Sequence, residues 1–307
     1  MEYQTILDEI LLEIEPYLGQ GEALQSTPTL ANEDTNAFAM SLQLLDGTSY
    51  HVGESEHKFS IQSISKLFSF TEALRIYGAD IYTRVGREPS GDPFNSLVLL
   101  EHEEGIPRNP FINAGAIVVA DALLSHYGNI DDAYGSIERL IRKACGDESV
   151  TFDRTIWFLE YRNGHRNMAL AHLMKSFSNL HNSVEDTVKV YCKYGSIMMS
   201  TALLSRAILF LANHGMDTAI NQPFISSSKV KRINALMLTC GHYDASGDFA
   251  FRVGLPSKSG TGGAIVAVVP NVMTLAVYAP RLNQNGISLA GIKALELFVS
   301  KTSFSIF

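Results

Sequence analysis

Cysteine is scarce in this chain of 307 residues, which contains three: Cys145, Cys192 and Cys240. They lie far apart and form no Cys-x-x-Cys pair and no His-x-Cys cluster. The sequence therefore argues against a zinc site and against a disulfide framework. We expect buried free thiols in a reducing compartment.

Long apolar runs and an excess of basic residues are also missing. No stretch approaches about 18 uninterrupted apolar residues, which argues against a membrane partner. Residues 1–18 carry acidic side chains and lack the basic start of a signal peptide, so we expect a cytoplasmic protein. The net charge of −8, from 24 basic and 32 acidic residues, argues against nucleic acid as a partner, because such binding needs a basic face.

The apolar residues that are present indicate a sizeable core, since hydrophobic residues make up 46% of the chain. Residues 37–52 predict a β-hairpin around Asp46-Gly47. Helical spacing predicts a helix before this hairpin, and its apolar positions are Ile6, Leu7, Ile10, Leu11, Ile14 and Leu18.

The pattern changes twice along the rest of the chain. Residues 61–78 predict a helix that ends at Gly78, and a long loop rich in Gly, Pro and Asn follows at 86–109, where we expect function. Helical patterns dominate residues 113–240. After Asp244 the sequence predicts short β-rich runs and one last helix, at 248–256, 263–270, 273–280 and 287–299.

These elements predict an α/β (α+β) fold with an antiparallel sheet that is flanked by helices and interrupted by a large inserted all-helical subdomain. We expect a single domain over residues 1–307. Its α/β part comes from residues 1–60 and 245–307, and its helical part from residues 61–244.

Ser63 and Lys66 have the Ser-x-x-Lys spacing of serine acyl-transfer enzymes. Residues three apart on a helix share a face, so a neutral lysine at this position can accept the serine proton. The backbone N–H of a serine at a helix start can also bind an oxyanion. Taken alone the spacing is weak, because an N-cap serine beside a solvated lysine produces the same pattern.

Lys258-Ser259-Gly260 precedes a β-rich run, as a Lys-Ser-Gly or Lys-Thr-Gly triplet does on the strand beside the nucleophile in such enzymes. Lys258 would supply a second positive charge that lowers the pKa of Lys66 or attracts a substrate carboxylate. Thr261 follows and would give a second N–H to the oxyanion. A flexible turn between two strands is the alternative interpretation.

Tyr191 is a candidate proton relay on the helical part, where no Ser-Asp-Asn motif occurs. A tyrosinate-like phenol near two lysines would shuttle the serine proton. An ordinary aromatic residue of a packed helix has the same spacing.

Longer segments give the chain a specific resemblance. Together with the residues above, it resembles the bacterial serine-dependent glutaminases from about residue 25 to about residue 300; the matching segments are 59–70, 85–97, 105–117 and 239–265. The resemblance implies the fold of serine β-lactamases and penicillin-binding proteins. It implies hydrolysis of L-glutamine to L-glutamate and ammonia, without a metal or organic cofactor.

By this resemblance Ser63 is the nucleophile and Lys66 its base, and Tyr191 takes part in proton transfer. The implied substrate contacts also include Asn113, Glu160, Asn167, Tyr191, Tyr243 and Thr261. Glu160 and Asn167 match the pair that holds the α-amino acid end of the substrate.

Two positions depart from the family pattern. Thr261 stands where valine is usual, and because this position acts through its N–H we expect a mild effect. Leu159 stands where a serine commonly precedes the glutamate.

The resemblance also suggests a homodimer or homotetramer. Two other functions stay open: another amidohydrolase or β-lactamase-like acyl-transfer enzyme, and a non-catalytic glutamine sensor.

Overall fold

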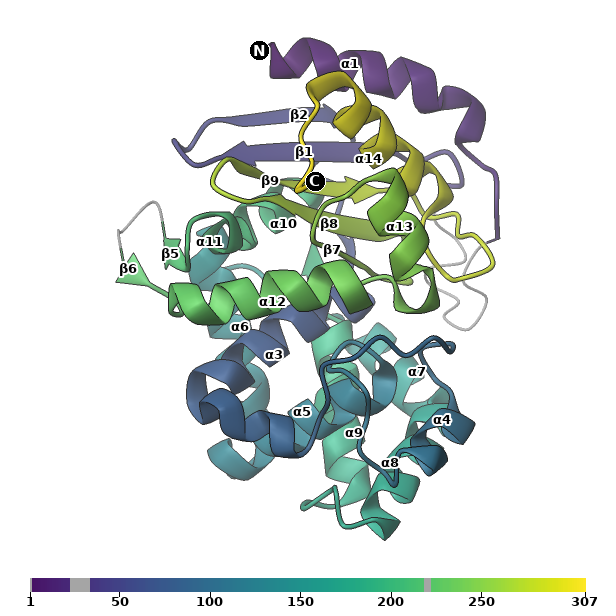
Figure 1. Ribbon diagram of the computed structural model, residues 1–307, viewed down its shortest axis with the longest axis vertical. Coiled ribbons are helices and arrows are strands. Elements are labelled where there is room, and N and C mark those ends of the chain that lie inside the picture. The colour runs from purple at the N-terminus through teal and green to yellow at the C-terminus, as the bar shows by residue number, and fades with distance from the viewer. Residues whose placement is uncertain (1, 23–33, 218–221) are drawn as a thin grey trace.

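A five-stranded antiparallel sheet lies in the upper half of the molecule as Figure 1 draws it. The computed structural model describes residues 2–22, 34–217 and 222–307. The strand order is β2-β1-β9-β8-β7, so strands from both ends of the sequence share one layer. The strands are β1 (Ala39–Leu44), β2 (Ser49–Gly53), β7 (Ser257–Ser259), β8 (Ala264–Val269) and β9 (Met273–Tyr278).

The central strands are buried on both faces. In β8 the odd-numbered residues from Ile265 to Val269 pack into one core, and the even-numbered residues from Ala264 to Val268 pack into another. Successive side chains of a strand point to opposite faces, so this single strand contributes side chains to both cores. This explains why β8 is an uninterrupted apolar run rather than an alternating one.

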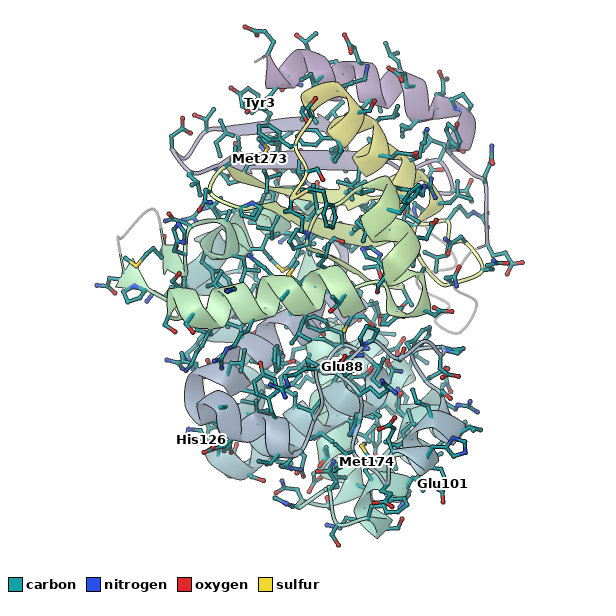
Figure 2. The ribbon with its side chains drawn as sticks, viewed as in Figure 1. Tyr3, Glu88, Glu101, His126, Met174 and Met273 are labelled. Carbon is teal, nitrogen blue, oxygen red and sulfur yellow. The ribbon has the colours of Figure 1, made fainter. Side chains whose placement is uncertain are left out.

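Helices cover both faces of the sheet. The first core contains residues of α1 (Tyr3–Ile14), α13 (Ser246–Arg252) and α14 (Leu289–Thr302), together with Met273 of β9 (Figure 2). Helices on the opposite face build the second core: α3 (Ser65–Tyr77), α5 (Asn113–Tyr127), α6 (Ile130–Cys145), α10 (Thr201–Ala207), α11 (Leu209–Ala212) and α12 (Ser227–Cys240).

A third apolar cluster lies among helices at the end of the molecule far from α1 (Figure 1). Met174 belongs to it (Figure 2). Its helices are α4 (Leu97–His102), α5, α7 (Arg154–Asn163), α8 (His165–Ser176) and α9 (Val184–Gly195). Among the described residues no helix is both long and apolar enough to cross a bilayer. The division of the chain into an α/β part and a helical part stays a proposal.

Short elements connect these layers. The two-residue strands are β3 (Phe59–Ser60), β4 (Met198–Met199), β5 (Met216–Asp217) and β6 (Gln222–Pro223). The 3-10 helices are η1 (Glu15–Tyr17), η2 (Gln62–Ile64), η3 (Gly78–Thr83) and η4 (Tyr243–Ala245).

Most predicted elements are present in the structure. The antiparallel sheet, the first helix and the last helix are confirmed, and α3 ends at Gly78, whose φ is +58°. The predicted hairpin is confirmed with a turn longer than two residues. Leu44 N–H donates to the Thr48 carbonyl, and Gly47 takes the left-handed conformation with φ +94°.

The prediction of a strand at 248–256 is wrong, because residues 246–252 form helix α13. Phe249, Phe251 and Val253 alternate in sequence as strand residues do. Phe249 and Val253 pack into the core, whereas Phe251 is 91% exposed. The buried pair is four residues apart, which is the spacing of one helix face.

Candidate active site

Ser63 lies in η2, a single turn between strand β3 and helix α3. Gln62 has a φ of +46°, a left-handed conformation that is rare for a residue with a side chain. Hydrogen bonds hold this turn from both sides. Ser60 Oγ donates to the Gly195 carbonyl at 2.8 Å, and Ser65 Oγ donates to the Gln62 carbonyl at 2.7 Å. Ser63 is therefore placed just before α3, by a constrained turn.

The turn that follows β7 packs directly on the Ser63 turn. A Cβ atom at Gly260 would lie 2.7 Å from the Ile61 carbonyl oxygen, and one at Gly262 would collide with the Ser60 carbonyl oxygen. Only glycine allows this close approach. Thr261, between the two glycines, is thereby held beside the Ser63 turn.

Lys66, in the first turn of α3, is buried with 2% exposure. Its ammonium donates to the Asn113 side-chain oxygen at 2.6 Å and to the Phe111 carbonyl at 3.2 Å. Burial lowers the pKa of Lys66 to about 7. A large fraction of Lys66 is therefore neutral near pH 7 and able to accept a proton.

Lys258, on β7, is completely buried. Its ammonium donates to the Ser259 carbonyl at 2.6 Å and to the Gly241 carbonyl at 3.0 Å. Burial, and after it the charge of Lys66, lowers the pKa of Lys258 well below its usual value. The charge of Lys66 therefore disfavours the charged form of Lys258.

Tyr243 links the two lysines. The centroid of its ring lies 4.2 Å from Lys258 Nζ and 5.6 Å from Lys66 Nζ. Burial raises the pKa of Tyr243, and the Ser63 side chain opposes part of that rise. Although Ser63 is its polar neighbour, the buried Tyr243 hydroxyl makes no hydrogen bond of standard geometry within the described part of the chain.

Tyr191 reaches the site from α9, and its ring centroid lies 5.9 Å from Lys66 Nζ. Burial raises the pKa of Tyr191 well above its usual value, with smaller contributions from Cys192, Tyr243 and Glu160. A neutral phenol is therefore favoured at this position, in contrast to the tyrosinate-like group that we expected.

Polar side chains continue from Lys66 across the helical cluster. Asn113 accepts from Lys66 and donates from its amide nitrogen to the Asn167 side-chain oxygen at 2.9 Å. Glu160, from α7, shares a small cavity with Ser63, Lys66 and Tyr191. The cavity measures about 20 Å³, which is room for about one water molecule.

A model of the glutaminase family matches residues 21–307. The chain belongs to the glutaminase family. A glutaminase of Aliarcobacter butzleri is 54% identical over 307 residues, with 100% of both chains covered. A glutaminase of Agrobacterium fabrum is 49% identical over 304 residues, which are 99% of this chain and 98% of the relative.

Solved glutaminase structures have the same fold. A Bacillus glutaminase crystal structure is 30% identical, with a TM-score of 0.91 and 100% of both chains covered. A probable glutaminase from Bacillus subtilis, complexed with 6-diazo-5-oxo-L-norleucine, is 29% identical with a TM-score of 0.90, and the match covers 100% of this chain and 98% of that one. The predicted family and fold class are therefore confirmed.

The structure of this glutaminase places the sequence-predicted site residues in one region. Ser63, Lys66, Glu160 and Tyr191 line one cavity, and the asparagines, Tyr243, Lys258 and Thr261 surround it through the contacts given above. Within the described part of the chain, no three His, Cys, Asp or Glu side chains lie close enough to hold a metal ion.

Two residues of this glutaminase site were not predicted from the sequence. Phe94 packs on Tyr243 with ring centroids 4.9 Å apart, and its carbonyl accepts from the Asn113 N–H at 2.8 Å. His242 donates to or accepts from Ser257 Oγ at 2.7 Å and so joins the segments that carry Tyr243 and Lys258. Phe94 lies in the predicted functional loop, and His242 directly precedes Tyr243. These positions in the sequence could have identified both residues as candidates.

Proposed function

We propose that this member of the glutaminase family hydrolyses L-glutamine to L-glutamate and ammonia through a γ-glutamyl ester on Ser63. The observation that carries the proposal is Lys66, a buried lysine with a lowered pKa that shares a small cavity with Ser63. A serine needs such a neighbouring base to become a nucleophile.

In the first half of the reaction, neutral Lys66 takes the hydroxyl proton of Ser63. The Ser63 oxygen then attacks the carbon of the glutamine side-chain amide. The C–N bond breaks, and the leaving nitrogen takes a proton from the Lys66 ammonium and departs as ammonia. In the second half, water attacks the ester by the same route and releases glutamate. The water-sized space beside Ser63 and Lys66 suits both the departing ammonia and the incoming water.

Tyr191 and Tyr243 would carry protons as neutral phenols. Both rings lie within 6 Å of Lys66 Nζ, and burial raises the pKa of each hydroxyl. A neutral hydroxyl both donates and accepts, so it can pass a proton without becoming an anion. We retain Tyr191 as the relay and add Tyr243, because the Ser63 side chain is the polar neighbour of its hydroxyl.

The oxyanion would be stabilised by the backbone N–H groups of Ser63 and Thr261. The glycines on either side of Thr261, which press against the Ser63 turn, support this role. Because a backbone group acts here, threonine can replace the usual valine.

The zwitterionic end of glutamine would contact Glu160 and the two asparagines. Its ammonium needs a carboxylate, and Glu160 lies at the same cavity as Ser63. Its carboxylate needs donors, and the Asn113 and Asn167 amides are linked to each other beside Lys66.

We also propose a cytoplasmic homodimer or homotetramer. The support for a reducing compartment is that all three cysteines are buried free thiols. The support for an oligomer is the family resemblance, and the mass of the purified protein in solution would test it.

The deciding experiment measures ammonia release from glutamine, asparagine and simple amides. We expect turnover of glutamine by the wild type and a loss of at least about a thousandfold in Ser63→Ala and in Lys66→Ala, because the two residues act as a unit. Circular dichroism would show that both variants fold.

Three results would oppose this proposal. Near-wild-type ammonia release by Ser63→Ala would exclude Ser63 as the nucleophile. Turnover of nitrocefin without turnover of glutamine would indicate a β-lactamase-like activity. Tight glutamine binding without ammonia release would indicate a sensor.

A further inference from the structure

His242 contacts the strand that carries Lys258. It stands between α12 and η4, whereas Ser257 and Lys258 are neighbours on β7, the edge strand of the sheet (Figure 1). His242 is 1% exposed, and its Nε2 atom lies 2.7 Å from Ser257 Oγ. Neighbouring residues of a strand point their side chains to opposite faces, so His242 contacts β7 on the face away from the Lys258 side chain.

The imidazole ring of His242 is held in one orientation. It stacks on the Phe249 ring of α13, with centroids 3.7 Å apart and 14° between the ring planes. The other ring nitrogen, Nδ1, is buried and has no hydrogen-bond partner among the described residues. Ser257 is completely buried as well. In this part of the chain, the contact with Ser257 is therefore the one polar anchor of the ring.

The residue that follows His242 has a strained backbone. Tyr243 has a φ of +58°, in the left-handed region, and surrounding contacts must hold an aromatic residue in this conformation. The Ser246 hydroxyl accepts from the His242 N–H at 3.0 Å and donates to the Tyr243 carbonyl at 2.9 Å. The His242 side chain connects the same turn to β7. The position of Tyr243 therefore depends on both contacts of His242.

Lys258 contacts the same turn from the other face of β7. Its ammonium donates to the Gly241 carbonyl at 3.0 Å and lies 4.2 Å from the centroid of the Tyr243 ring. A Cβ atom at Gly241 would collide with the Ser257 carbonyl oxygen, so the turn and the strand are in close contact. A change at His242 would therefore move the Tyr243 ring and Lys258 Nζ relative to the nucleophile.

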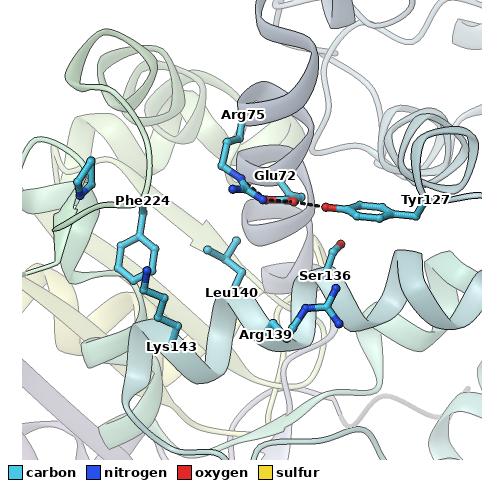
Figure 3. Close-up of a pocket in the computed structure, with 9 residues that line it drawn as sticks. Glu72, Arg75, Tyr127, Ser136, Arg139, Leu140, Lys143 and Phe224 are labelled. Atoms are coloured by element: carbon cyan, nitrogen blue, oxygen red, sulfur yellow. Dashed lines mark hydrogen bonds and ion pairs between the residues drawn. The ribbon is translucent and has the colours of Figure 1, made fainter. Parts of the chain in front are cut away.

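The hydrogen bond of His242 adds no charge beside Lys258. Burial, and after it the charge of Lys258, lowers the pKa of His242 well below its usual value, so the imidazole is neutral at pH 7. A carboxylate at this place would raise the pKa of Lys258. Figure 3 shows the contrasting case on α3, where the Glu72 carboxylate accepts from Arg75 and Tyr127. Charged groups hold that part of α3, whereas an uncharged hydrogen bond holds the turn beside Lys258.

We propose that His242 is a positioning residue for the reaction, because its hydrogen bond to Ser257 fixes the turn that carries Tyr243. The same bond fixes the part of β7 that precedes Lys258. The inference rests on the proposed function, in which the Tyr243 hydroxyl carries a proton beside Ser63. Displacement of a reacting group by about 1 Å can lower a rate by about 100-fold, so a small movement of the turn is measurable as turnover.

The loss should appear in kcat and not in KM. Glu160 and Asn167, which would bind the amino acid end of glutamine, lie on other elements, α7 and α8. Substrate binding should therefore survive the loss of the His242 contact, whereas proton transfer becomes slower. A residue that only stabilised the fold would lower the free energy of unfolding and leave both kinetic constants unchanged.

The test is a double-mutant cycle on steady-state ammonia release from glutamine. His242→Met keeps much of the bulk of the ring without its hydrogen bond, Ser257→Ala removes the partner, and a double variant removes both. His242→Gln supplies a side-chain amide that can bond to Ser257. Thr274→Val is the matched control, because Thr274 is a completely buried residue of the same sheet whose hydroxyl donates to the Ser205 carbonyl at 2.6 Å.

We expect kcat to fall by roughly 10- to 100-fold in His242→Met and in Ser257→Ala, with KM changed by less than about twofold. The double variant should lose no more than the larger of the two single losses, because the two side chains form one contact. His242→Gln should recover most of kcat, and Thr274→Val should keep it. Losses that multiply in the double variant overturn the proposal, as does a wild-type kcat in His242→Met. If His242→Met does not fold, Ser257→Ala, the smaller change, carries the test.

A second measurement does not depend on turnover. Hydrogen exchange followed by mass spectrometry reports the local opening of residues 239–245 and 257–261. We expect faster exchange of both segments in His242→Met and in Ser257→Ala, and unchanged exchange of both in Thr274→Val. Unchanged exchange in the first two variants overturns the positioning role. Absence of ammonia release by the wild type instead contradicts the proposed function.

Discussion

The surroundings of Lys66 determine its pKa. An exposed lysine has a pKa near 10.4 and is protonated at neutral pH, so it cannot act as a base. Burial lowers the pKa of Lys66 to about 7, although one amide oxygen and one carbonyl accept hydrogen bonds from its ammonium. The charge of Lys66 in turn lowers the pKa of Lys258, which is also buried, on β7. On an exposed helix the same lysine would stay protonated at neutral pH, and the proposed Ser63–Lys66 pair would lack its base.

The pH dependence of turnover should report this pKa. Lys66 must be neutral to accept the proton, and its neutral fraction rises with pH through about 7. We therefore expect kcat/KM for glutamine to rise about tenfold per pH unit below pH 7 and to level off above it. Steady-state assays of ammonia release between about pH 5.5 and 9 measure this. A profile that stays flat across pH 7 would contradict Lys66 as the base.

Glu160 should act mainly in binding. If it holds the substrate ammonium in both the ground state and the transition state, Glu160→Gln raises KM for glutamine and changes kcat little. Loss of one charged hydrogen bond corresponds to roughly 10- to 100-fold in KM. Glu101→Gln is the matched control, because Glu101 is exposed on α4 (Figure 2). An unchanged KM in Glu160→Gln would remove Glu160 from the ammonium site.

At the scale of elements, sequence patterns that fit only one backbone structure predicted it correctly. Patterns that fit both a helix and a strand did not. The end of α3 followed from Gly78, and the hairpin from Asp46-Gly47, because few residues accept those backbone conformations. Phe249 and Phe251 suit a strand by alternation, and only packing shows that one is buried and the other exposed. The Phe94–Tyr243 contact joins residues about 150 apart, so no local pattern contains it.

Substitution of the two phenylalanines of α13 tests whether this segment is a helix or the strand predicted from the sequence. Phe249 is 4% exposed and stacks on His242, with centroids 3.7 Å apart. We expect Phe249→Ala to lower the free energy of unfolding by about 3–5 kcal/mol. Phe251→Ala should change it by less than about 0.5 kcal/mol, because that ring is 91% exposed. Urea unfolding compares the two. Similar losses in both variants would favour a strand, in which both rings share one face.

At the scale of the whole molecule, Asp121 fastens separate parts of the helical region together. This α5 carboxylate is completely buried and accepts from Arg84 after η3 and from the backbone N–H groups of His181 and Asn182 before α9. Burial alone would raise the pKa of Asp121, but these donors outweigh it and lower the pKa. The group therefore stabilises the fold above the ordinary pKa of an aspartate, about 3.9, and that contribution is lost as the pH falls through the lowered folded value.

Removing this charge should weaken the fold far more than removing an exposed one. In Asp121→Asn the Arg84 guanidinium, whose side chain is 16% exposed, loses its carboxylate, so we expect a loss of about 3–5 kcal/mol at pH 7. Asp131→Asn is the control, because Asp131 pairs with Lys193 while 90% exposed, and its loss should stay below about 1 kcal/mol. Urea unfolding at pH 7 measures both. If the two losses are equal, burial gives the Asp121 network no advantage, and the apolar contacts of α5, α8 and α9 alone hold the helical region together.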